Sequence, residues 1–175
     1  KYDKALTYLN SAISQANTIN NSYLVTDLYM DLVQLYIQQG NFNKGILYLS
    51  NTLDSIRNKG DKSKVLTLLN NIGHAYKSEG KVDSAFTYFR RALRHNDSTM
   101  LPEQSITLTN IGFCFLEHLD NEDSAFYYLN QANEIYLKSD NKRSLRKNLE
   151  KTGSWYTSQG QIPKALNFYD QALMS

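Results

Sequence analysis

Apolar side chains recur along this chain at steps of three and four residues, the spacing that places them on one face of a helix. Leu69, Ile72 and Tyr76 form one such stretch, and Ala85 and Phe89 belong to a second. Only a few residues separate the two stretches, which is the usual length of a turn between neighbouring helices. The pattern therefore predicts an antiparallel pair of helices, or hairpin, in this part of the chain.

The same pattern returns about every 40 residues along the whole chain. A column of small residues shows the repeat most plainly: Ala5, Gly45, Ala85, Ala125 and Ala165. Repetition at a fixed period is typical of proteins built from stacked copies of one helical unit. It predicts the second helix of a truncated repeat over residues 1–20, followed by hairpins over residues 21–60, 61–100, 101–140 and 141–175. The chain is then a single all-α array, residues 1–175, with about nine helices.

Glycines and short polar residues support this division. Glycines that can adopt a positive φ fall in three of the predicted turns: Gly40, Gly80 and Gly160. The predicted second helices begin at residues that cap free N–H groups or fit a first turn: Asp3, Asn43, Asp83, Asp123 and Pro163. Three more glycines lie inside first helices, where each costs about 1 kcal/mol relative to alanine: Gly73, Gly112 and Gly153. We expect these three to face the small column of the second helix.

The repeated residues resemble the signature of the tetratricopeptide repeat family. The most complete copy consists of Leu69, Ile72, Gly73, Tyr76, Ala85, Phe89 and Ala92. The resemblance implies a right-handed α-solenoid of antiparallel helix pairs, whose first helices line a concave face. The period of 40 residues is longer than the commonest one, which is about 34 residues. With the pair Asn70-Asn71, this length makes the chain similar to repeats of kinesin light chain and of bacterial regulatory proteins.

Composition excludes several classes of protein. The chain has 175 residues, 41% hydrophobic side chains and a net charge of +2, which suit a globular domain rather than a polybasic or acidic disordered chain. No apolar stretch approaches the roughly 20 residues of a membrane helix. Cys114 is expected to be buried and inert, and the histidines His74, His95 and His118 form no metal-binding pattern. We predict a protein that is not an enzyme and uses no metal or cofactor.

Positions off the apolar stripe of the first helices predict a binding surface. The candidate ligand contacts are Asp31, Gln34, Asn70, Asn71, His74, Asn110, Phe113, Lys147 and Lys151. A side-chain amide both donates and accepts, so Asn71 and Asn110 could hold the backbone of an extended peptide whatever its sequence. The resemblance implies the same role for groove asparagines. The alternative, that these asparagines bond a neighbouring hairpin or water, stays open.

Charge is unevenly distributed over the last two repeats. Residues 101–140 carry one positive and seven negative charges, and residues 141–175 carry six positive and two negative charges. Five of the cations form a basic stripe on one predicted helix: Lys142, Arg143, Arg146, Lys147 and Lys151. The stripe could attract an acidic peptide or a phosphate backbone, or it could complement the acidic repeat beside it. The acids Glu117, Glu122 and Asp123 are predicted to be turn charges and a cap.

The leading hypothesis is a scaffold that binds a protein or peptide in its concave groove, as a segment of a larger regulatory or signalling protein. Because the chain starts at Lys1 inside a predicted second helix, we expect it to be part of something longer. The alternative is a sensor or regulatory domain of a bacterial transcriptional regulator or kinase, acting through self-association of uncapped end helices. We expect neither membrane association nor direct nucleic-acid binding by this segment. A cytoplasmic location is favoured, although targeting signals would lie outside the chain.

Overall fold

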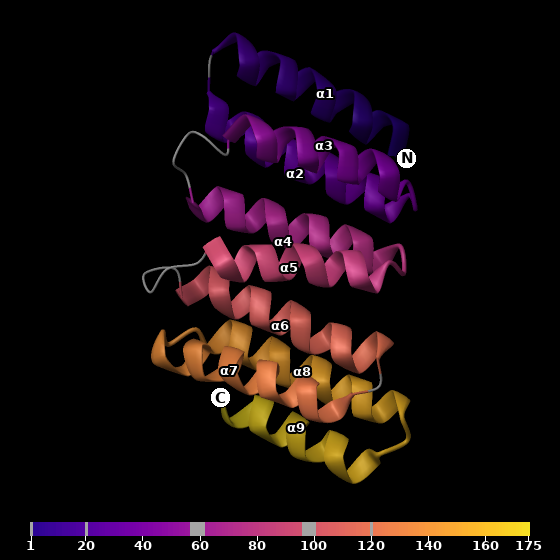
Figure 1. The fold of residues 1–175 in the computed structure, drawn as a ribbon, viewed down its shortest axis with the longest axis vertical. Coiled ribbons are helices and arrows are strands. Elements are labelled where there is room, and N and C mark those ends of the chain that lie inside the picture. The colour runs from indigo at the N-terminus through magenta and orange to yellow at the C-terminus, as the bar shows by residue number, and fades with distance from the viewer. Residues whose placement is uncertain (1, 20, 57–61, 96–100, 120) are drawn as a thin grey trace. The chain divides into compact units, whose positions relative to one another are not determined.

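The computed structural model describes residues 2–19, 21–56, 62–95, 101–119 and 121–175 (Figure 1). These ranges contain nine helices and no strand: α1 (Tyr2–Thr18), α2 (Ser22–Gln38), α3 (Phe42–Ile56), α4 (Lys62–Ser78), α5 (Val82–His95), α6 (Leu101–His118), α7 (Glu122–Lys138), α8 (Lys142–Ser158) and α9 (Ile162–Met174). The prediction of an all-α chain with about nine helices is confirmed. The predicted repeat boundaries at residues 20, 60 and 100 lie outside the described residues.

The helices form two compact units, Lys1–His95 and Asn96–Ser175. In the first unit, α1 packs on α2, the hairpins are α2–α3 and α4–α5, and α3 packs on α4. In the second unit, the hairpins are α6–α7 and α8–α9, and α7 packs on α8. The first helices of adjacent hairpins also touch, α2 with α4 and α6 with α8. Each unit therefore presents a surface made by two neighbouring first helices; the single array over both units stays a prediction.

Glycine turns end the first helices of three hairpins. Gly40, Gly80 and Gly160 have φ of 72°, 81° and 70°, the left-handed conformation that glycine adopts without a Cβ clash. The N–H of Gly40 donates to the oxygen of Ile37 at 2.9 Å, and the next N–H reaches back five residues. Equivalent bonds close the other two turns. The predicted role of these glycines is confirmed.

The glycines inside the first helices make room for large side chains. A Cβ on Gly73 would lie 2.5 Å from the ring of Phe89, and one on Gly153 would lie 2.9 Å from the ring of Tyr169. A Cβ on Gly112 would lie 2.6 Å from Cγ of Leu129. The predicted approach to the small column is confirmed at Gly112, where a Cβ would also lie 3.1 Å from the oxygen of Ala125, but at Gly73 and Gly153 the nearest atoms belong to Phe89 and Tyr169. The side chain that fills each space stands one helical turn after the alanine of the small column.

The predicted start of the second helices is also corrected. The structure begins α7 at Glu122, so Asp123 lies one residue inside the helix. The cap is Asn121, whose side chain accepts a hydrogen bond from the N–H of Ser124 at 2.9 Å. Asp123 remains favourable there, because a carboxylate in the first turn suits the positive end of the helix dipole. Pro163 does lie in the first turn of α9, as predicted.

Candidate functional site

In the second unit, the surface of the first helices α6 and α8 contains a cavity of about 230 Å³. Its lining comes from α6, α7 and α8: Ile106, Thr109, Asn110, Phe113, Tyr136, Ser144, Lys147, Asn148 and Lys151. Four of the residues predicted to contact a ligand are therefore brought together: Asn110, Phe113, Lys147 and Lys151. The cavity combines amides, hydroxyls and two ammonium groups, so it suits a polar, hydrogen-bonding ligand group.

One ammonium group of this cavity is held in place. Nζ of Lys151 lies 3.8 Å from the ring centroid of Phe113, which is itself 2% exposed. The same Nζ lies 2.8 Å from Oε1 of Glu117, in the last turn of α6. A ring face and a carboxylate both attract a cation, so together they fix where this positive charge stands. Glu117 was predicted to be a turn charge; the structure instead pairs it with α8.

Two further polar side chains, Thr109 and Asn148, also line this cavity. Oγ1 of Thr109 lies 3.2 Å from the hydroxyl of Tyr136, and Nδ2 of Asn148 donates to Oδ1 of Asn133 at 2.8 Å. Asn148 is 4% exposed, and its Oδ1 has no hydrogen-bond partner among the described residues. A buried acceptor without a donor costs stability. The sequence does contain a signal for Asn148: it occupies the repeat position at which α4 carries Leu68, on the apolar stripe of the first helices.

In the first unit, the predicted contacts divide between α2 and α4. Asp31 and Gln34 are exposed on α2, and Asn71 and His74 are half-buried on α4. Asn70 is only 5% exposed, and its Nδ2 donates to the backbone oxygen of Leu66 at 3.2 Å within the same helix. The structure therefore turns Asn70 inward and leaves its neighbour Asn71 nearer the surface of α4.

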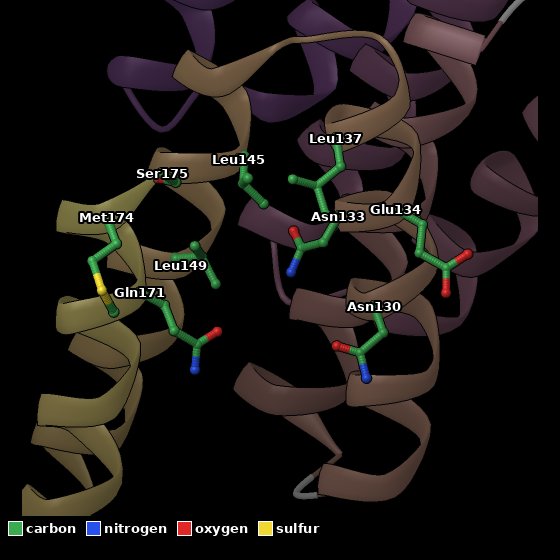
Figure 2. A pocket seen from close by; sticks show the side chains of 9 residues that line it. All are labelled: Asn130, Asn133, Glu134, Leu137, Leu145, Leu149, Gln171, Met174 and Ser175. Carbon is green, nitrogen blue, oxygen red and sulfur yellow. The ribbon is translucent and has the colours of Figure 1, made fainter.

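A larger cavity, of about 540 Å³, lies between the second helices α7 and α9 of the second unit (Figure 2). Leu145 and Leu149 of α8 line it from behind. Its remaining lining residues come from the last turns of α7 and the end of α9: Asn130, Asn133, Glu134, Leu137, Gln171, Met174 and Ser175. None of the residues predicted to contact a ligand lies here. The two cavities therefore lie on two different faces of the second unit.

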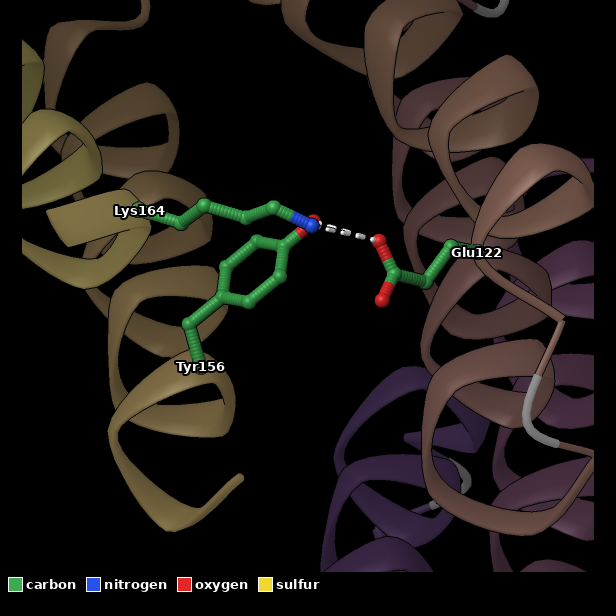
Figure 3. A network of polar contacts seen from close by, with 3 residues as sticks. All are labelled: Glu122, Tyr156 and Lys164. Atoms are coloured by element: carbon green, nitrogen blue, oxygen red, sulfur yellow. Dashed lines mark hydrogen bonds and ion pairs between the residues drawn. The ribbon is translucent and has the colours of Figure 1, made fainter. Parts of the chain in front are cut away.

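A carboxylate joins the three last helices near the start of α7 (Figure 3). Oε2 of Glu122 accepts hydrogen bonds from the hydroxyl of Tyr156 at 2.9 Å and from Nζ of Lys164 at 3.3 Å. Burial alone would raise the pKa of Glu122, but these two donors outweigh it and hold the pKa below its usual value. Burial, and then the bond to this carboxylate, raise the pKa of Tyr156. Glu122 was predicted to be a turn charge or cap; it is a contact between helices.

Comparison with known proteins identifies the repeat. Residues 66–97, from the first turns of α4 to just beyond α5, match the tetratricopeptide repeat family. The chain carries a tetratricopeptide repeat. The match identifies the repeat in this part of the chain, and the remaining hairpins resemble it in sequence. Tetratricopeptide repeats are generally non-catalytic scaffolds for protein–protein interaction.

Solved structures share the fold over nearly the whole chain. BtubC (BKLC) from P. vanneervenii is 23% identical, with a TM-score of 0.71 over 99% of this chain and 72% of its own. MamA is 16% identical, with a TM-score of 0.57 over 99% of this chain and 87% of its own. Among the curated proteins, none matches. The predicted fold class, a tetratricopeptide-type helical solenoid, is confirmed by these two structures.

Membrane-spanning helices and metal-binding clusters are both absent from the described residues. No helix in these ranges is both long enough and apolar enough to pass through a membrane. No group of three or more His, Cys, Asp or Glu side chains in the same ranges is placed to hold a metal ion. Cys114 is fully buried, as the sequence predicted.

Proposed function

We propose that this chain is a non-enzymatic interaction module, part of a larger regulatory or signalling protein, that binds an extended peptide segment on its first helices. The observation that supports this most directly is the cavity of α6 and α8, in which Asn110, Phe113, Lys147 and Lys151 lie together. Each side chain stands on a packed helix. Such a surface is already formed before a ligand arrives, which keeps the entropy cost of binding low.

Two asparagines would provide the backbone contacts. Asn71 and Asn110 occupy the same repeat position, two residues before Gly73 in α4 and Gly112 in α6. Both side chains are half-buried, so each remains partly accessible to a ligand. An amide that donates to a peptide carbonyl and accepts from a peptide N–H binds backbone without reading side chains. Each unit supplies one such residue.

The test is the double variant Asn71→Ala/Asn110→Ala, measured with a peptide selected from a random display library on the unaltered chain. We expect the affinity to fall about tenfold, since two hydrogen bonds are lost. The denaturation midpoint should stay nearly unchanged. The matched control is Asn10→Ala/Asn130→Ala, which removes two exposed amides from α1 and α7 and should leave affinity intact. Unaltered affinity in the first variant would remove the proposed site.

Self-association is a second candidate function, favoured by the exposed apolar side chains of α9. Leu166, Leu173 and Met174 are 56%, 82% and 81% exposed. Side chains of this kind gain free energy when a partner surface covers them. Sedimentation velocity at several protein concentrations distinguishes the two functions, because only self-association predicts a coefficient that rises with concentration.

A further inference from the structure

The cavity between the second helices α7 and α9 has an apolar floor and apolar walls (Figure 2). Leu145 and Leu149 of α8 form the floor, and each is 6% exposed. Leu137 of α7 and Met174 of α9 stand in the walls, and they are 65% and 81% exposed. A single exposed leucine means little, but apolar side chains gathered around one cavity gain free energy when a partner covers them. The cavity therefore offers the apolar surface that a docking site needs.

The spacing of the lining residues is that of helix faces. Those on α7 stand at i, i+3, i+4 and i+7: Asn130, Asn133, Glu134 and Leu137. Those on α9 stand at i, i+3 and i+4: Gln171, Met174 and Ser175. Among the described residues, α7 and α9 each pack on α8 and not on one another. The space between them is thus a groove bounded by three helices, into which a further helix fits with its own apolar stripe.

The charge of this groove is negative. Glu134 is the one charged side chain among the described residues that line it. Glu134 is exposed and forms no ion pair within the described ranges. Lys138, the single cation of α7, does not line the cavity. An apolar surface with one carboxylate at its edge favours a ligand that carries positive charge beside its apolar face.

The equivalent positions of the first unit have a different charge. On α3 an acid, Asp54, also stands at the position of Glu134. On α5, however, Arg91 and Arg94 occupy positions at which α9 carries uncharged residues. With two cations for one carboxylate, these positions do not attract a cationic ligand. Of the two units, only the second combines the apolar surface with an acid that no neighbouring cation offsets.

We infer that the cavity between α7 and α9 binds a basic amphipathic helix of a partner protein, with apolar side chains on Leu145 and Leu149 and a lysine or arginine at Glu134. The inference goes beyond the proposed function, which concerns extended peptides on the first helices, and does not depend on it. A second copy of this chain fits less well. Its exposed apolar residues on α9, Leu166 and Leu173, share a helix face with Asp170, and like charges at an interface repel.

The experiment is an affinity measurement on the whole chain with two synthetic helical peptides of about 18 residues. One has leucines at i, i+3, i+4 and i+7 and lysines elsewhere, and the other has glutamates in place of the lysines. We expect the lysine peptide to bind at least about tenfold more tightly. Glu134→Gln should weaken its binding about threefold. The matched control Asp170→Asn removes an exposed acid outside the cavity and should change affinity less than about twofold.

The apolar contact is tested with the double variant Leu137→Ser/Met174→Ser. We expect it to weaken binding of the lysine peptide about tenfold, since two apolar side chains of the cavity are lost. The matched control Leu166→Ser/Leu173→Ser replaces two exposed apolar residues of α9 that do not line the cavity, and it should change affinity less than about twofold. Because all four side chains are exposed, both variants should keep the denaturation midpoint of the unaltered chain.

Four results would overturn the inference. They are no binding of the lysine peptide, equal affinity for the two peptides, equal losses in the cavity variants and their controls, and self-association through the cavity. The last is measured by sedimentation velocity: a coefficient that rises with concentration in the unaltered chain, but not in Leu137→Ser/Met174→Ser, would assign the cavity to a second copy. None of these results bears on the site of α6 and α8, which Asn71→Ala/Asn110→Ala tests separately.

Discussion

Glu122 shows how one side chain can give a repeat its own chemistry. The other second helices carry Tyr2, Phe42, Val82 or Ile162 at this position. The carboxylate instead accepts from Tyr156 and Lys164, so it links α7 to α8 and α9 (Figure 3). Charged groups held by two donors in this way are stabilised in their ionised form. The contact therefore makes part of the stability of the second unit depend on pH.

We predict that Glu122→Gln destabilises the chain at neutral pH, and that the difference from the unaltered chain shrinks in acid. The folded pKa of Glu122 lies below its usual value, so its contribution is fully present above that usual value and is lost as the pH falls through the folded pKa. Urea denaturation of both proteins at about pH 7 and about pH 3 measures this. A difference that stays constant between these conditions would contradict the assigned contact.

The sequence could not reveal this contact, because the partners of Glu122 lie 34 and 42 positions away in the chain. What the sequence does show is that Glu122 is an acidic residue in a repeat column that is otherwise apolar or aromatic. Asn148 is a similar case, a polar residue in an apolar stripe. A residue that departs from its repeat column therefore indicates a position where a specific contact is formed. The partner in that contact is found only in the structure.

At the scale of elements, the hairpins that begin with α4, α6 and α8 each depend on a glycine in the first helix. Gly112 leaves space that Leu129 of α7 fills, and Leu129 is only 2% exposed. The oxygen of Ala125 lies at 3.1 Å from where a Cβ would stand, so the backbone of the second helix also approaches closely. The helix accepts a residue of low propensity because the packing gained across the hairpin is larger.

We predict that Gly112→Ala destabilises the second unit despite the better helix propensity of alanine. A buried leucine and a backbone oxygen cannot both move away, and overpacking of this kind costs about 1–3 kcal/mol. The control is Gly45→Ala in α3, where a Cβ would meet Cγ1 of Val33 at an ordinary 3.4 Å. That variant should be neutral or stabilising by up to about 1 kcal/mol. Denaturant titration compares them, and equal effects would contradict the packing described here.

The hairpins were predictable because their signal is repeated. A column that recurs about every 40 residues marks both the helix pair and its turn, and the turn glycines confirm it with positive φ at Gly40, Gly80 and Gly160. The exact residue at which a helix starts was harder to predict, since Asn121 and Asp123 are both good capping residues. The structure decides between them through the bond to the N–H of Ser124.

At the scale of the molecule, two faces of the second unit each contain a cavity. The first helices α6 and α8 contain the cavity with Asn110 and Lys147, and the second helices α7 and α9 contain the larger cavity (Figure 2). The repeat pattern predicted Asn110, Phe113, Lys147 and Lys151 of the first face, because solvent-facing positions of a helix follow from its apolar stripe. The second cavity was not predicted, because the predicted contacts were limited to the first helices and its lining comes mainly from the second helices α7 and α9.

The most direct test of the account is a chemical-shift map of the chain with a peptide selected on it. We predict changes at the side-chain amides of Asn71 and Asn110 and at the backbone around Lys147 and Lys151. The amides of Asn130 and Gln171, in the cavity between α7 and α9, should not shift. Shifts confined to those two residues and their neighbours would place the ligand on the second helices and contradict the proposed site.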